Sequence, residues 1–339
     1  MTSNRKPATG YRTSESGVSL VEVMIAMLLG LLLLAGIMQV FSSSRQTYRV
    51  HEAVSRMQEN GRMALEVISR DIRMADFWGC SGNISNVVNN LDSAQSGFID
   101  FDLGGVGGTN SAGAAPDTLI LRGGINSGLS ITPPYGPEPS ASIGVAPNSG
   151  LQQGDIVFIS DCTNGDVFQV TNANPNGSGQ LVHNTGLAVA PGNSNVTNPG
   201  CPGANAHCLS KVYGGDATVF SAQQIIYTIA PGSEGQPALF RNGLEFIDGI
   251  EDFQVLFGED TDAPGTAGFA IANYYVPADQ VVNMNNVVSI RFAVVMRSYE
   301  DNLSGNVAQN YTVLGTNMVS GDNRLRQVYT STVAIRNRI

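Results

Sequence analysis

Residue types that could support catalysis are few in this sequence. Histidine is the side chain that most often acts as a general base, and the chain contains only His51, His183 and His207. None of them lies in a nucleophile motif such as G-x-S-x-G, and no Ser-His-Asp or Cys-His arrangement is evident. The glycine-rich run GGVGG at 104–108 does not lead from a strand into a helix, as a phosphate-binding loop does. We therefore expect no catalytic residues and a protein that is not an enzyme.

Four cysteines offer either disulfide or metal chemistry: Cys80, Cys162, Cys201 and Cys208. Four cysteines allow three connectivities, and the sequence alone does not choose among them. The loop CPGANAHC between Cys201 and Cys208 begins with a Pro-Gly turn signal, which favours local pairing and leaves Cys80 with Cys162 by elimination. Zinc is the alternative because His207 lies between two thiols, but no C-x-x-C spacing supports it. We expect disulfide bonds, no metal and no other cofactor.

A run of acids at Glu259, Asp260 and Asp262 could provide oxygen ligands for calcium. The run departs from an EF-hand loop because Pro264 stands where a ligand belongs and the terminal Glu is missing. A solvated acidic turn is the simpler interpretation, and calcium binding stays open.

The composition indicates a loop-rich β protein. Of the 339 residues, 42% are hydrophobic, 14% are charged and 39 are glycine, which suits neither a disordered chain nor a helical bundle. The formal net charge is -10, and no cluster of Lys and Arg is present. Because phosphate contacts need such a cluster, we expect no nucleic-acid partner.

The most informative segment is residues 18–41, VSLVEVMIAMLLGLLLLAGIMQVF, whose one charged residue is Glu22. Its 24 residues are enough to cross a hydrocarbon core of about 30 Å as a helix. Three basic residues against one acid precede it, which predicts a cytoplasmic N-terminus. A secretory signal would place its small residues after the apolar run, whereas here they come before it. An acid inside such a span is unfavourable unless it has a partner or a purpose.

Residues 17–27 read G-VSLVE-VMIAM and resemble the cleavage and assembly motif of type IV pilins and pseudopilins. The resemblance implies that a membrane peptidase cuts after Gly17 and that the new N-terminus is methylated. The first mature residue of the family is commonly Phe, whereas this chain has Val18. Glu22 is the fifth mature residue, and the resemblance implies that it pairs with the N-terminal amine of a neighbouring subunit. Such pairing neutralises two charges that are costly to bury separately.

The likeness is closest to the PilW type of minor pilin, and it covers about a third of the chain. It is carried by WGC at 78–80, DIVFISDCTNGDVFQVT at 155–171, FRNGLEFIDGIEDFQVLFGEDTD at 240–262, VVSIRFAVVMRS at 287–298 and AIRNR at 334–338. The GspJ type of pseudopilin from type II secretion is the nearest alternative. A membrane-anchored ligand-binding or enzymatic domain is a third, in which the N-terminus is only an anchor.

The resemblance implies a structural subunit near the pilus tip that helps to initiate pilus assembly and so supports twitching motility. Its implied partners are other minor pilins, the major pilin, a tip adhesin and the prepilin peptidase. We expect the subunit to reside in the inner membrane, with the N-terminus in the cytoplasm, and then to move to the pilus at the cell surface.

The expected fold is α+β, with a long N-terminal pilin-like helix packed against an antiparallel β-sheet and a loop-rich C-terminal domain. We expect a cytoplasmic leader at residues 1–17, a transmembrane and filament-core helix at 18–41, an amphipathic continuation at 42–76 and a β-rich outer domain at 77–339.

Apolar residues mark the helix face that the domain should cover, because they recur every three or four positions. They are Val50, Val54, Met57, Gly61, Ala64, Ile68 and Ile72. Glycines 30, 36 and 61 are points where this helix could bend. Strands are expected at 117–122, 154–160, 166–171, 223–230, 238–243, 250–260, 287–300 and 324–339, and surface loops at 103–116, 130–150 and 190–208.

Overall fold

The computed structural model describes residues 17–79, 86–113, 115–133, 135, 142–185, 189–194, 208–305 and 307–338. The chain divides into two compact units, Met1–Glu52 and Ala53–Ile339. In the described part of the first unit, the regular structure is helical, and the second unit holds the end of the same helix together with the strands.

A single helix, α1 (Leu20–Met74), is 55 residues long and continuous through all three of its glycines. The predicted helix is therefore confirmed, and the helical structure is not interrupted at the glycines. The helix ends in a tightened turn in which the Ala75 N–H donates to the carbonyl of Ile72 at 3.2 Å. Asp76 then adopts the left-handed conformation with φ 59°, which cannot continue a helix.

The remaining described chain is mainly β-structure joined by turns. The strands are β1 (Val87–Asn89), β2 (Val106–Thr109), β3 (Thr118–Ser130), β4 (Ser142–Gly144), β5 (Ile156–Ser160), β6 (Gly165–Gln169), β7 (Gln180–Val182), β8 (Thr218–Pro231), β9 (Pro237–Arg241), β10 (Leu244–Asp248), β11 (Ile250–Glu259), β12 (Tyr274–Val276), β13 (Val287–Arg297), β14 (Asn310–Val313), β15 (Thr316–Val319) and β16 (Arg326–Ala334). The short helices are η2 (Phe101–Leu103), α2 (Pro175–Ser178), η3 (Ala278–Gln280), η4 (Met284–Asn286) and η5 (Arg336–Arg338). All eight predicted strand segments contain a strand.

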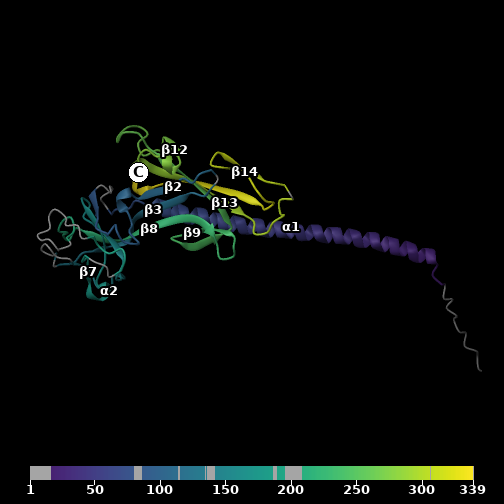
Figure 1. Ribbon diagram of the computed structural model, residues 1–339, viewed down its shortest axis with the longest axis horizontal. Coiled ribbons are helices and arrows are strands. Elements are labelled where there is room, and N and C mark those ends of the chain that lie inside the picture. The colour runs from purple at the N-terminus through teal and green to yellow at the C-terminus, as the bar shows by residue number, and fades with distance from the viewer. Residues whose placement is uncertain are drawn as a thin grey trace, which may run out of the picture. The chain divides into compact units, whose positions relative to one another are not determined.

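Two main sheets organise these strands. The larger sheet has the order β1-β6-β5-β8-β3-β2, with β9 and β10 added beside β8, and the smaller has the order β12-β11-β13-β16. Every strand pair in them is antiparallel except β1 with β6. Figure 1 shows β3, β8 and β9 side by side. The expected α+β class, with a long N-terminal helix and antiparallel sheets, is confirmed.

The apolar stripe of α1 forms part of the main hydrophobic core. Ala64, Ile68 and Ile72 are 0% exposed and lie in one cluster with residues of both sheets. Among these are Leu119 from the larger sheet and Phe292 from the smaller. Burying one isoleucine side chain is worth about 1.5–3 kcal/mol, so this stripe contributes several kcal/mol to holding helix and sheets together. The predicted interior face of the helix is confirmed.

The predicted loop regions are partly wrong, because 103–116 contains β2 and 130–150 contains β4. In β2, Gly108 lies so close to β3 that an added Cβ would sit 2.4 Å from the carbonyl oxygen of Thr118. Glycine lowers strand propensity, yet here it permits this close approach of two backbones. The GGVGG run thus serves strand pairing, a role that its composition alone does not indicate.

Gly61 is a second position where the missing side chain is required. A Cβ there would lie 2.5 Å from Cε2 of Tyr329 on β16. We expect Gly61→Ala to destabilise the protein by about 1–3 kcal/mol through overpacking, although alanine is the better helix former by about 1 kcal/mol. Denaturant unfolding of the full chain in detergent measures this change. In a Tyr329→Ala background the same substitution should become stabilising, and Gly36→Ala, with no atom within 4 Å, is the matched control.

Candidate functional site

The predicted processing position lies in an open stretch just before α1. Among the described residues, no atom beyond the chain neighbours lies within 4 Å of a Cβ built on Gly17, and Val18 is 68% exposed. Hydrogen bonding of the helix begins at once, because the Val23 N–H donates to the carbonyl of Ser19 at 3.1 Å. Glu22 lies in the first turn of α1, where a carboxylate is favoured by the helix dipole. The Gly17–Val18 peptide bond is therefore accessible, and Glu22 follows it by about one helical turn.

The first half of α1 presents apolar side chains on all its faces. Leu20 is 76% exposed, Met38 is 71% exposed and Val40 is 71% exposed. An 18-residue window of this helix has a mean hydropathy of 2.6, and none of the window is buried. By length and composition this helix could span a membrane. Such a surface needs lipid or protein around it, because water solvates it poorly.

The second half of α1 is fastened to the sheets by a buried carboxylate, Asp71. Its Oδ2 accepts hydrogen bonds from the Tyr227 hydroxyl at 2.6 Å and from Nε of Arg241 at 3.0 Å. Arg241 also forms an ion pair with it through NH2 at 3.0 Å. Burial, together with the hydrogen bond to Asp71, raises the pKa of Tyr227, so the hydroxyl remains a donor. This contact links α1 to β8 and β9 in the interior.

Two more ion pairs hold the same part of the helix and its end. Arg56 NH2 and Asp248 Oδ2 are 2.5 Å apart, and Asn60 Nδ2 donates to Oδ1 of the same carboxylate at 2.9 Å. After the helix, Asp76 pairs with Arg338 near the C-terminal end of the described chain. The helix is therefore fixed to the β-structure at three levels, through Asp248, Asp71 and Asp76.

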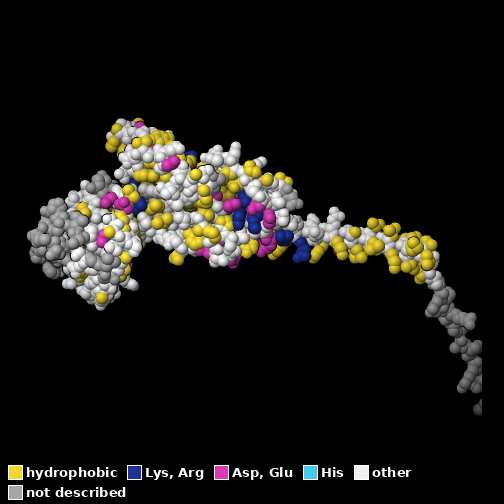
Figure 2. All heavy atoms as spheres, in the orientation of Figure 1, with side chains coloured by type: hydrophobic (Ala, Val, Ile, Leu, Met, Phe, Trp, Pro, Cys, Tyr) yellow, Lys and Arg dark blue, Asp and Glu magenta, His cyan; other side chains and the backbone are white. Residues whose placement is uncertain are grey.

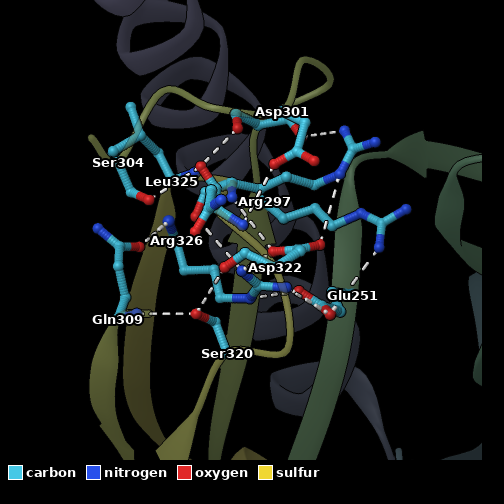
Figure 3. A network of polar contacts seen from close by, with 12 residues as sticks. Glu251, Arg297, Asp301, Ser304, Gln309, Ser320, Asp322, Leu325 and Arg326 are labelled. Carbon is cyan, nitrogen blue, oxygen red and sulfur yellow. Dashed lines mark hydrogen bonds and ion pairs between the residues drawn. The ribbon is translucent and has the colours of Figure 1, made fainter. Parts of the chain in front are cut away.

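A larger polar network, which the sequence does not predict, surrounds Arg326 at the start of β16 (Figure 3). Its guanidinium donates two hydrogen bonds to Glu251, at 2.8 and 3.0 Å, and one to Asp322 at 2.5 Å. The Arg326 side chain is only 2% exposed. Arg297 approaches Glu251 at 3.9 Å, and Arg324 donates to the carbonyl of Ser298 at 3.0 Å. These bonds tie the segments that flank β14 and β15 to the smaller sheet.

This network predicts a pH dependence of stability. The Arg326 hydrogen bond holds the pKa of Asp322 below its usual range. A carboxyl whose pKa is lowered in the folded state stabilises the fold at pH values above its unfolded-state pKa, which is about 3.9. This stabilisation is lost as the pH falls through the folded-state pKa. The difference in unfolding midpoint between wild type and Asp322→Asn should therefore be present at pH 7 and disappear at strongly acidic pH. Asp216→Asn, which changes an exposed acid outside this network, is the matched control.

The described histidines and the acidic run lie in surroundings that show no catalytic or metal-binding arrangement. His51 is exposed on α1, His183 is 1% exposed against the ring of Phe168 at 5.0 Å, and His207 lies outside the described residues. Asp260 accepts from the backbone N–H groups of Asp262 and Ala270. Within the described residues, no group of three His, Cys, Asp or Glu side chains is arranged to hold a metal ion.

Glu259 is likewise engaged within its own loop. Its carboxylate accepts from the Tyr274 hydroxyl and from the backbone N–H groups of Val282 and Asn283. The acidic run therefore organises the chain between β11 and β13, which is a role that its composition does not reveal.

The cysteines can be followed in part. Cys162 and Cys208 are each part of a disulfide bond, so no cysteine among the described residues is free. Cys80 and Cys201 lie outside the described residues. Local pairing of Cys201 with Cys208, and of Cys80 with Cys162, stays a prediction.

The first half of α1 is thus bare apolar surface, and its second half enters the core of the β-rich second unit. A family model for Type IV Pilus-assembly protein W, PilW, matches residues 226–337. The resemblance to the PilW type is thereby confirmed for the C-terminal third of the chain.

The matched region begins within β8 and includes the whole of the smaller sheet and the Arg326 network. The match supports a type IV pilus-associated protein and suggests a structural rather than an enzymatic role.

The chain was also compared with solved structures and with curated proteins. The type IV-like pilin TTHA1219 from Thermus thermophilus is similar at 9% identity and a TM-score of 0.33, over 83% of this chain and 96% of that chain. No curated protein matches the sequence.

Proposed function

We propose that this chain is a minor pilin of the type IV pilus, cleaved after Gly17 and incorporated close to the pilus tip, where it helps to initiate assembly. The observation that carries the proposal is the exposed apolar half of α1, which starts with Glu22 in its first turn and continues into the core of a unit that matches the PilW family. An anchor alone would not need an acid at this position.

Each segment of the chain has its own role in this proposal. Residues 1–17 form the leader that the prepilin peptidase removes at the cytoplasmic side of the inner membrane, after which Val18 is methylated. Residues 18–41 hold the subunit in the membrane before assembly and pack beside other pilin helices in the filament. Residues 42–76 connect this helix to the outer β-rich domain at 77–339.

Glu22 supplies the specificity of helix packing. In an apolar filament core, a carboxylate and the N-terminal ammonium of a neighbouring subunit are each unfavourable alone, and together they neutralise one another. Helices that do not align Glu22 with that amine leave both charges unpaired. The outer domain then determines partner choice among other minor pilins, the major pilin and a tip adhesin.

The test is N-terminal sequencing of the mature protein isolated from cells. A sequence that starts at Val18 is expected, with Gly17→Val blocking the cut and Gly10→Val, a change within the leader, leaving it intact. An intact Met1, or a cut beyond residue 41, would reject the proposal.

A type II secretion pseudopilin of the GspJ type has the same N-terminal motif, so processing does not separate it from a minor pilin. Deletion of the gene separates the two alternatives. We expect loss of twitching motility with normal protein secretion, whereas the reverse result would favour the pseudopilin. An anchored enzyme or binding domain would instead keep its activity without residues 1–76.

A further inference from the structure

An exposed apolar patch lies on the segment between β11 and β13. Its members are Phe269, Ile271, Tyr274 and Val282, which are 47%, 66%, 36% and 85% exposed. Figure 2 shows hydrophobic side chains gathered on the projection that carries β12 in Figure 1. Single exposed hydrophobic residues are ordinary on protein surfaces, but a cluster of them in one segment marks an interaction site.

The patch is held in place by two adjacent buried carboxylates. Oε2 of Glu259 accepts from the Tyr274 hydroxyl at 2.8 Å and from the Val282 N–H at 3.1 Å, which brings these two patch residues together. Oδ2 of Asp260 accepts from the N–H of Ala270 at 2.7 Å, the residue between Phe269 and Ile271. Glu259 is 1% exposed and Asp260 is 6% exposed, so both anchors belong to the interior. A preformed surface loses less conformational entropy when it binds a partner.

Every charged residue of the segment that carries the patch, residues 260–286, is acidic, while Arg291 of β13 lies over the ring of Tyr275, 3.9 Å from its centroid. Residues 242–290 contain no Lys, Arg or His. Asp262 lies beside Gly268, where an added Cβ would be 2.6 Å from its Oδ2, and Asp279 is exposed at η3, three residues before Val282. Apolar side chains with an acidic rim are complementary to apolar side chains with a basic rim.

We propose that the patch of Phe269, Ile271, Tyr274 and Val282 docks a second protein that presents apolar side chains flanked by lysine or arginine. This inference rests on the proposed function and deepens it, because it assigns the chemistry of one partner surface of the subunit. A phospholipid surface fits less well because the charged residues of the patch's own segment, 260–286, are all carboxylates and would repel anionic headgroups. A second copy of this chain would bring the same acidic rim and be repelled.

The edge of the smaller sheet adds to the surface. β12, which includes Tyr274, is the terminal strand of the order β12-β11-β13-β16 and pairs with β11 over three residues. Its other edge has no strand partner among the described elements. The partner can therefore contact backbone groups of β12 beside the apolar side chains.

Site-specific photo-crosslinking of the full chain in its native host tests the proposal. Phe269 or Val282 is replaced by benzoylphenylalanine, the cells are irradiated, and the cross-linked peptide is identified by mass spectrometry. We expect one protein partner whose attached peptide has apolar residues with Lys or Arg next to them. Val319→benzoylphenylalanine, at a position on β15 whose 67% exposure lies between those of Phe269 and Val282, is the control and should give no such product.

Charge reversal makes the test specific for the rim. Asp279→Lys, introduced with the cross-linker at Phe269, should reduce the yield of the product about tenfold. Asp216→Lys changes the net charge equally at an exposed position elsewhere and should leave the yield unchanged. Equal unfolding midpoints of the two variants exclude a folding defect.

Several outcomes would overturn the inference. They are a yield no higher than at Val319, cross-links to lipid or to a second copy, a partner peptide without basic residues, and a yield that Asp279→Lys does not change. N-terminal sequencing of the same preparation separates the two proposals. A start at Val18 without the cross-link rejects the patch alone, whereas an uncleaved chain rejects the proposed function.

Discussion

Glu22→Ala is expected to lower the amount of this subunit in purified pili by at least about tenfold. The substitution leaves the ammonium of a neighbouring subunit unpaired among apolar helices, and breaking a buried ion pair costs about 3–5 kcal/mol, where 1.4 kcal/mol is already tenfold. Quantitative immunoblotting of sheared pili against whole cells measures the incorporated fraction. The cellular level and the cut after Gly17 should not change, because the open peptide bond before α1 does not depend on this carboxylate.

Matched variants separate charge from shape at this position. Glu22→Gln keeps the size and the hydrogen-bonding capacity of the side chain but not its charge, so it should be nearly as defective as alanine. Ser19→Ala, one turn earlier in the same apolar segment, should be incorporated normally. Normal incorporation of Glu22→Ala would refute the pairing, and the apolar helix would then need another explanation.

Much of the fold could be predicted from patterns within the chain. The spacing of Ile68 and Ile72 identifies the buried face of α1, and both residues are fully buried. The alternating and β-branched segments of the C-terminal third correspond to β11, β13 and β16. These features are local, because a helix or strand places its side chains with a fixed period.

Contacts between distant segments could not be predicted in this way. The bond between Asp71 and Tyr227 joins residues 156 positions apart, and the Arg326 bonds to Glu251 join residues 75 apart. No periodicity relates such positions, since only the folded chain brings them together. Gly61 illustrates the same limit, because its close contact with Tyr329 is invisible in the helix pattern.

The candidate sites divide in the same manner. Gly17, Val18 and Glu22 are recognisable because a short continuous motif carries them. The apolar patch between β11 and β13 could not be predicted, because a sequence does not distinguish apolar residues buried in a strand from apolar residues exposed on the surface. The run Glu259, Asp260 and Asp262 predicts a solvated acidic turn and leaves calcium open, whereas Glu259 and Asp260 are buried and anchor the patch through hydrogen bonds.

Asp71→Ala is the substitution from which we expect the largest loss of stability, about 3–5 kcal/mol. It removes a carboxylate that is 8% exposed and accepts from both Tyr227 and Arg241, so it leaves a phenol and a guanidinium without their partner. Trp78, the single tryptophan of the chain, is 1% exposed near the end of α1 and reports unfolding by fluorescence. Denaturant titration of the full chain in detergent gives the free energy of unfolding.

Single and double variants show whether Asp71 acts through these two bonds. Tyr227→Phe removes one donor and should cost about 1–3 kcal/mol, and its effect should largely vanish when Asp71 is already alanine. Glu66→Ala, at an exposed position of the same helix, should change stability by less than about 0.5 kcal/mol. If Asp71→Ala were as mild as this control, the buried carboxylate would not fasten α1 to β8 and β9. The attachment of α1 to the β-structure would then depend on the apolar stripe and on the ion pairs of Asp248 and Asp76.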